Sequence, residues 1–180
     1  MPMWRTGTVE PGGRHERGFS LIEILIVLVI IGVTTGAVVL SVRGSGERAL
    51  ENAARRAQAL LQLACERAEL GGRDIGIAPV RNGLRFGYFQ VDGWHPLGEE
   101  GSDELRARVL GKDVQLRAWR ENVELALSDE AGAEPAFACL SSGELTPFVL
   151  RIDRGDIEHP WQLEARLDGS LELARVSREP

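Results

Sequence analysis

The hydrophobic positions divide the chain into three stretches with different periods. The first is an unbroken apolar run of 22 residues from Leu21 to Val42. As an α-helix, a run of this length spans about 33 Å, close to the roughly 30 Å thickness of the hydrocarbon core of a bilayer. We therefore predict a transmembrane helical segment over residues 19–42.

The second stretch, residues 43–72, predicts an amphipathic helix because its apolar residues recur at helical spacing and form one stripe. The stripe consists of Leu50, Ala53, Ala54, Ala57, Leu60, Leu61, Ala64, Cys65 and Ala68. On the polar side, Glu51 and Arg55 are spaced for an i,i+4 ion pair. The stripe is expected to pack on the core of a globular domain.

The end of this helix is marked by Gly71 and Gly72, which are typical stop signals. Alanine, leucine, glutamate and arginine, all good helix formers, dominate the segment before them. If the helix continues through residues 43–46, a single helix runs from Phe19 to about Leu70.

From residue 73 onward the period changes to two, which predicts strands. The alternating segments are residues 74–80, 84–91, 113–119, 123–128, 136–142, 148–153, 161–167 and 171–176. Asn82-Gly83, Asp92-Gly93 and Asp168-Gly169 are dipeptides suited to tight hairpins, and residues 97–113 are expected to form a mobile loop. The predicted class is α+β, with one long N-terminal helix packed on antiparallel β-sheet in a β-rich globular domain, residues 73–180.

The length and the net charge of the chain limit the number of domains and the kinds of partner that it can have. With 180 residues, the chain is long enough for one membrane segment and one modest domain. Its net charge of −6, from 21 basic and 27 acidic residues, disfavours nucleic acid as a partner.

The chain shows no clear catalytic or metal-binding pattern. The three histidines, His15, His95 and His159, lack the spacing of metal ligands or of a catalytic triad. Cys65 and Cys139 do not form a CxxC motif. An exported domain would permit a disulfide, but the place of Cys65 on the buried stripe favours an inert free thiol. We therefore expect a non-enzymatic protein without a cofactor.

One acid interrupts the apolar run. Glu23 lies three residues into it, and a carboxylate in a membrane helix costs about 2.5–3.5 kcal/mol on insertion scales. Such a residue is expected to have a partner or a function. The preceding residues 1–18 form a polar leader, whose arginines favour the cytoplasmic side of the membrane.

The stretch "RGFSLIEILIVLVIIG" resembles the class III signal of type IV pilins and type II secretion pseudopilins. The resemblance implies that a prepilin peptidase cleaves between Gly18 and Phe19 and that the new Phe19 amine is N-methylated. It also implies that Glu23 pairs with the Phe19 amine of a neighbouring subunit during assembly. Gly32 and Gly36 form a GxxxG pattern that can let helices approach closely.

Two further stretches, "FGYFQVDGWHPL" and "CLSSGELTPFVLRI", resemble the pseudopilin H family of type II secretion systems. The resemblance implies a pilin-like fold and a structural subunit near the tip of a periplasmic pseudopilus that aids export of folded exoproteins. Its partners would be the prepilin peptidase, the major pseudopilin, other minor pseudopilins and the inner-membrane assembly platform. The chain would cross the inner membrane once, with its C-terminal domain in the periplasm.

Two alternatives stay open on the sequence. A minor pilin of a type IV pilus, for pilus assembly, motility or DNA uptake, shares the signal and the helix. An uncleaved, signal-anchored periplasmic binding domain would share the hydropathy pattern alone, and its mature form would keep residues 1–18.

Overall fold

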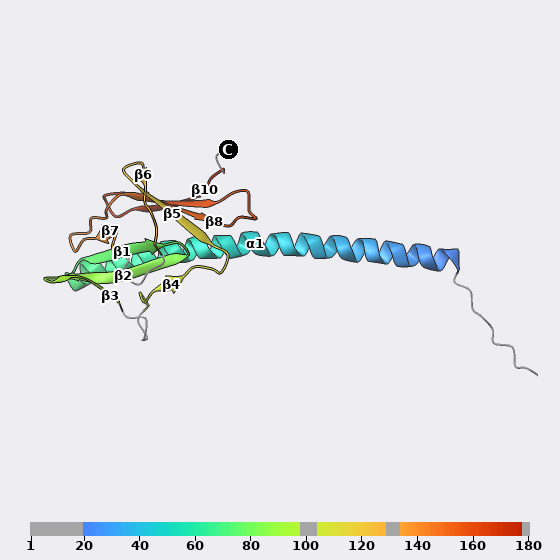
Figure 1. Ribbon diagram of the computed structural model, residues 1–180, viewed down its shortest axis with the longest axis horizontal. Coiled ribbons are helices and arrows are strands. Elements are labelled where there is room, and N and C mark those ends of the chain that lie inside the picture. Colours follow the sequence, from blue (N-terminus) through green and yellow to red (C-terminus); the bar gives the residue numbers. More distant parts are fainter. Residues whose placement is uncertain (1–19, 98–103, 129–133, 178–180) are drawn as a thin grey trace, which may run out of the picture. The chain divides into compact units, whose positions relative to one another are not determined.

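The computed structural model describes residues 20–97, 104–128 and 134–177, apart from the side chains of residues 37–44 (Figure 1). It divides into two compact units, Met1–Ser41 and Val42–Pro180. Helix α1, Leu21–Gly71, contains 51 residues and runs through the boundary between them. The prediction of one continuous helix is confirmed, whereas the predicted leader, residues 1–18, lies outside the described residues.

In the first unit, the described side chains of helix α1 are mostly apolar and exposed. The Ser20 carbonyl accepts hydrogen bonds from the N–H groups of Glu23, at 3.0 Å, and Ile24, at 3.3 Å, and so begins the helix. Residues 20–36 are all exposed. Within the part of the chain that the structure describes, no helical stretch combines the length and apolarity that a membrane crossing requires. The predicted segment 19–42 extends beyond the described side chains and stays a prediction.

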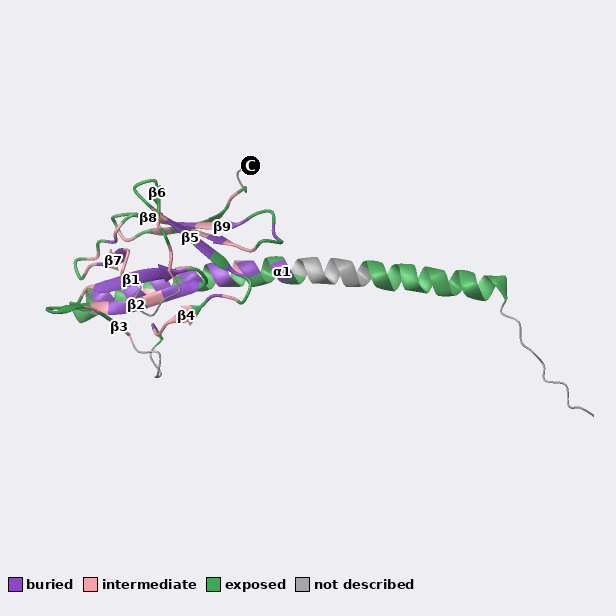
Figure 2. Ribbon diagram, viewed as in Figure 1, coloured by how far each residue is buried: buried purple, intermediate pink, exposed green. Residues whose placement is uncertain are grey.

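In the second unit, helix α1 buries the predicted stripe (Figure 2). Its buried residues are Leu50, Ala53, Ala54, Ala57, Leu60, Leu61, Ala64 and Ala68. On the polar side, Arg55 and Glu51 form the expected pair, with nitrogen and oxygen 2.9 Å apart. The helix ends as predicted, since Gly72 adopts φ +60° and the next N–H bonds back to the Ala68 carbonyl at 3.2 Å.

The strands are antiparallel, as predicted, and form two sheets (Figure 1). The first has the order β3-β2-β1-β7, with β4 paired to β2. Its strands are β1 (Ile75–Val80), β2 (Gly83–Gln90), β3 (Gly93–Pro96), β4 (Arg108–Val109) and β7 (Phe137–Cys139). The second sheet has the order β10-β9-β8-β5-β6. Its strands are β5 (Gln115–Arg120), β6 (Val123–Glu124), β8 (Phe148–Asp153), β9 (Trp161–Ala165) and β10 (Leu171–Arg175).

One hydrophobic core joins the helix stripe to both sheets. Along β8 the burial pattern alternates strictly, so Phe148, Leu150 and Ile152 point into this core. Strand β1 lies between β2 and β7 and is buried along its whole length. The buried stripe of helix α1 is therefore part of the domain core, and the opposite side of the helix is exposed.

Strand β3 was indicated only by the Asp92-Gly93 turn, and β4 was missed, because segments of four and two residues show no readable alternation. The Trp94 ring of β3 lies over Gly76 and Gly87, where an added Cβ would come within 2.5 Å and 2.6 Å of the indole. The expected mobile loop at residues 97–113 is corrected in part. Leu105 and Leu110 in it are buried in the core, and residues 98–103 lie outside the described part of the chain.

The three predicted hairpin turns are present. Gly93 and Gly169 adopt φ of +133° and +81°, conformations that glycine reaches without steric cost. A fourth turn was missed. Glu121 and Asn122 both have positive φ, 52° and 64°, and join β5 to β6. The dipeptide Glu-Asn is not a usual hairpin signal, since glutamate seldom adopts positive φ.

Two turn carboxylates are held by short-range hydrogen bonds. The bond to the His95 ring, at 2.9 Å, lowers the pKa of Asp92, and the bond from the Ser170 hydroxyl, at 2.6 Å, lowers that of Asp168. Each ionised group therefore stabilises the fold above its unfolded-state pKa. That contribution is lost as the pH falls through the lowered folded-state pKa.

Candidate assembly site

The exposed half of helix α1 carries a single charged residue between Leu21 and Gly36, the acid Glu23. Its side chain is exposed in the first helical turn, where the helix dipole favours an anion. Among the described residues, its carboxylate makes no hydrogen bond or ion pair. Gly18 and Phe19, the predicted processing residues, lie outside the described part of the chain. The assembly role of Glu23 and the processing at Gly18 and Phe19 therefore stay predictions.

Gly32 and Gly36 leave a smooth strip on the same segment. A Cβ added at either position would meet no atom within 4 Å. Between them, the Thr34 hydroxyl donates to the Ile30 carbonyl at 2.8 Å, so its hydrogen-bonding capacity is used within the helix. The glycines therefore serve no packing purpose within the described chain, and their role in helix–helix packing stays a prediction.

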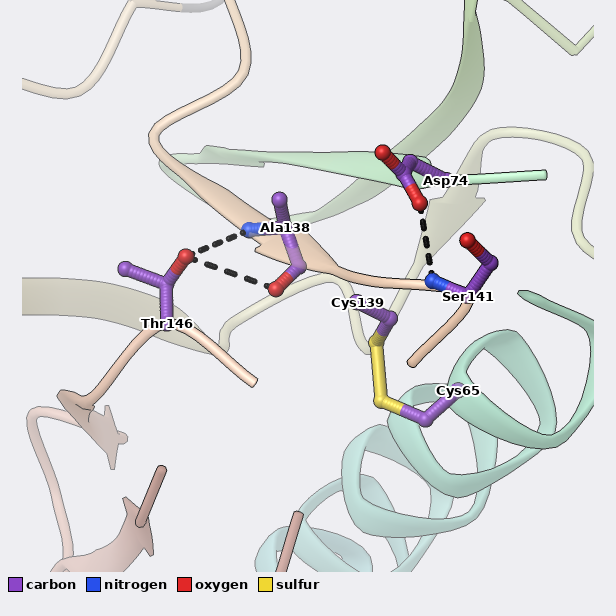
Figure 3. The surroundings of a disulfide bond; sticks show 6 residues. All are labelled: Cys65, Asp74, Ala138, Cys139, Ser141 and Thr146. Carbon is purple, nitrogen blue, oxygen red and sulfur yellow. Dashed lines mark hydrogen bonds between the residues drawn. A yellow bond between two sulfur atoms is a disulfide. The ribbon is translucent and has the colours of Figure 1, made fainter. Parts of the chain in front are cut away.

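Cys65 and Cys139 form a disulfide that joins helix α1 to strand β7 (Figure 3). The expected free thiol at Cys65 is therefore wrong. Strand β7 pairs with β1 and brings two cysteines 74 positions apart in sequence to a Cα–Cα distance of 4.9 Å. Helical periodicity placed Cys65 correctly on the stripe, but it could not show which strand would lie opposite.

Hydrogen bonds secure the chain on both sides of Cys139 (Figure 3). The Ser141 N–H donates to the Asp74 carboxylate at 2.8 Å. The Thr146 hydroxyl accepts from the Ala138 N–H at 3.1 Å and donates to the Ala138 carbonyl at 3.4 Å. The disulfide and these bonds together fasten the β7–β8 turn to the helix end and to the start of β1.

The described part of the chain does not bring the candidate metal ligands together. Within these ranges, no group of three or more histidine, cysteine, aspartate or glutamate side chains could hold a metal ion. His95 is engaged with Asp92, His159 is exposed, and His15 lies outside the described part. The notable features of the described chain are the exposed apolar half of helix α1 and the disulfide that joins this helix to strand β7.

Comparisons with known proteins agree with this picture. Residues 13–39 match the family described as the prokaryotic N-terminal methylation motif. The chain is 32% identical over 182 residues to type II secretion system protein H of Aeromonas hydrophila, with 92% of this chain and 98% of the relative covered. It is 32% identical over 152 residues to type II secretion system protein H of Pseudomonas aeruginosa, with 79% and 86% covered.

Solved structures show the same fold. The minor pseudopilin EPSH from the type II secretion system of Vibrio cholerae is 27% identical with a TM-score of 0.54, and the match covers 72% of this chain and 97% of that one. The solution structure of E. coli GspH is 23% identical with a TM-score of 0.54, and the match covers 73% of this chain and 90% of that one. This likeness supports the fold.

A methylation motif at the start of one long helix, whose second half is built into an antiparallel α+β domain, defines a pilin-like assembly protein. The chain belongs to the family of type II secretion system protein H. Its role is that of a minor pseudopilin in type II secretion.

The role of a minor pseudopilin in type II secretion, which the sequence favoured, is therefore confirmed. The comparisons do not favour the two alternatives, a type IV minor pilin and an uncleaved anchored binding domain. The family is one of structural pseudopilins. The methylation motif and the family together indicate processing by a prepilin peptidase, anchoring in the inner membrane and a place in the periplasmic pseudopilus.

Proposed function

We propose that prepilin peptidase cleaves the chain between Gly18 and Phe19 and that Phe19 is then N-methylated. Residues 1–18 are the cytoplasmic leader, and residues 19–42 form the membrane half of the helix. Residues 43–72 and 73–180 form the amphipathic half of the helix and the globular domain in the periplasm. The methylation motif at residues 13–39 supports this division.

Assembly in this proposal depends on Glu23. The carboxylate pairs with the positively charged Phe19 amine of a neighbouring subunit as the helices come together. In a low-dielectric surrounding an unpaired carboxylate costs about 2.5–3.5 kcal/mol, and an opposite charge at hydrogen-bond distance offsets this cost. The proposal is supported by the exposure of Glu23 and by the lack of a partner for it among the described residues.

The subunit takes a place near the tip of the pseudopilus, with the major pseudopilin, the other minor pseudopilins and the assembly platform as partners. It aids the export of folded exoproteins across the outer membrane. The disulfide between Cys65 and Cys139 supports a load-bearing role, because it ties the assembly helix covalently to the sheet. Energy comes from a separate ATPase, and the chain itself needs no cofactor.

A clean deletion in the native host tests this function. Exoprotein in the culture supernatant is compared with surface piliation and twitching, and the wild-type gene is restored as a control. Lost secretion with intact pili is expected. Normal secretion with lost pili or lost transformation would contradict the proposal and favour the type IV pilus.

The processing step is tested by mass analysis of the N-terminus. The mature chain is expected to begin with methylated Phe19, and Gly18→Val is expected to leave unprocessed precursor in the membrane. Gly13→Val, a glycine change of the same size within the leader, is the control and should be processed normally. A mature chain that begins at Met1 would overturn the assigned site.

A further inference from the structure

The outer face of the second sheet carries two arginines around one tryptophan. Along β5, Leu116 and Ala118 point into the core, so Arg117 and Trp119 point away from it. On the neighbouring β8, Arg151 faces outward and is the register partner of Arg117. We call Arg117, Trp119 and Arg151 the arginine cluster.

Like charges directly opposite on neighbouring strands repel one another. Here the indole offsets part of this repulsion, because the guanidinium carbons of Arg117 and Arg151 lie 5.5 Å and 5.3 Å from the Trp119 ring centroid. Among the described residues, neither arginine has a hydrogen bond or a carboxylate partner, and the Nε of Arg151 is buried without an acceptor. The cluster thus holds several unused donors in place.

Another arginine of the same sheet shows the usual arrangement. Arg175 lies over the Trp161 ring at 5.6 Å, and it also pairs with the Glu47 carboxylate at 3.6 Å. Stacking on an indole therefore does not prevent an arginine from pairing with an acid. The arginine cluster differs because it lacks the acid.

We propose that the arginine cluster binds one carboxylate of an acidic segment on another protein of the secretion machinery. This inference rests on the proposed function for the kind of partner. Guanidinium groups match the planar carboxylate and bind it through paired N–H donors. A shallow pocket of about 190 Å³ beside Trp119 is lined in part by Pro147 and Val149 and accommodates an apolar side chain next to the bound acid.

The surroundings favour a single carboxylate over an extended polyanion. Glu121 and Glu164 line the same pocket beside Trp119, and Asp153 lies two residues from Arg151 on β8. These acids and the net charge of −6 repel a nucleic acid backbone or an anionic lipid surface. A single carboxylate carries one negative charge and therefore meets less of this repulsion than a polyanion does.

The test is photo-cross-linking of the full chain in the native host, with p-benzoylphenylalanine at Gln162, the register neighbour of Arg151 on β9. We expect an adduct with another protein of the machinery, cross-linked at a peptide that contains Asp or Glu beside an apolar residue. In R117Q/R151Q the adduct should fall by about tenfold or more, as expected for the loss of charge-assisted hydrogen bonds. R175Q, the matched control on the same sheet, should keep it.

Charge reversal completes the test. R151E should abolish the adduct, and changing the mapped partner carboxylate to lysine should restore it. Equal adducts in R117Q/R151Q and R175Q, a cross-linked peptide without an acid, or an adduct with lipid or nucleic acid would each overturn the inference. Methylated Phe19 and secretion are measured in the same cells. Normal processing and secretion without an adduct would therefore refute this site and leave the proposed function standing.

Discussion

The two halves of helix α1 differ in how their apolar side chains are arranged and how far they are buried. In the first half, large aliphatic side chains surround the helix, and Leu21 is 83% exposed. In the second half, most apolar residues form one buried stripe, rich in alanine, and Leu61 is 0% exposed. Small residues let the sheets approach the second half closely. The apolar stripe of the second half is thus buried by its own chain, whereas the described side chains of the first half are left exposed.

This difference has an energetic consequence. Full burial of a leucine, isoleucine or valine side chain is worth about 1.5–3 kcal/mol. Eleven large aliphatic side chains between Leu21 and Val33 are exposed, so water is a poor environment for this half. A membrane or the packed helices of a filament would remove them from water, whereas the domain from Leu50 onward has already done so.

Removing the first half should have the largest effect on this comparison. A chain that starts at Glu47 should be a soluble monomer, because the stripe is already buried against its own sheets. Gel filtration and sedimentation measure this. A chain that starts at Ser20 and keeps the apolar half is the control and should stay with the membrane fraction. Aggregation of the shorter chain would mean that the stripe needs another subunit.

Glu23→Val should separate insertion from assembly. The substitution makes the segment more apolar, so processing should continue, but the charged partner of the Phe19 amine is lost. We expect a processed subunit that is absent from isolated pseudopili and does not restore secretion. Thr34→Val removes a hydroxyl that bonds within its own helix and should have no effect. Full function of the Glu23 variant would refute the ion pair.

Cys65→Ser should lower the stability of the globular domain and leave the apolar half of helix α1 unaffected. Loss of a disulfide that closes a long loop typically lowers the free energy of unfolding by about 2–4 kcal/mol. Urea denaturation of the chain starting at Glu47 measures this change. Because one bond is lost in either case, Cys65→Ser/Cys139→Ser should match the single variant. If a reductant left the urea midpoint of the wild-type domain unchanged, the disulfide would not contribute this stability.

Glu51→Ala should have the smallest effect. The pair with Arg55 is exposed at both ends, and such i,i+4 pairs are worth about 0.3–0.5 kcal/mol. Glu66→Ala on the same exposed side is the control, since it makes the same change in helix propensity without breaking a pair seen among the described residues. The difference between the two variants in urea should disappear at high salt. A loss above 1 kcal/mol would show a larger role for this surface.

The sequence alone predicted most of the local structure. Helical spacing located the buried stripe from Leu50 to Ala68, and alternation found eight of the ten strands. The dipeptides Asn82-Gly83, Asp92-Gly93 and Asp168-Gly169 located three hairpins. These features are legible because each depends on residues a few positions apart. The methylation motif at residues 13–39 is local in the same sense.

Tertiary structure decided which distant segments meet. Alternation marks the face of a strand but not its neighbour, so the division into two sheets was not predictable. The pairing of β7 with β1 brought Cys139 to Cys65, and the pairing of β5 with β8 placed Arg117 beside Arg151. Both juxtapositions depend on packing between residues far apart in the chain. The sequence by itself determined the elements and their inward faces, and only the closure of the core decided which cysteines and which charges lie together.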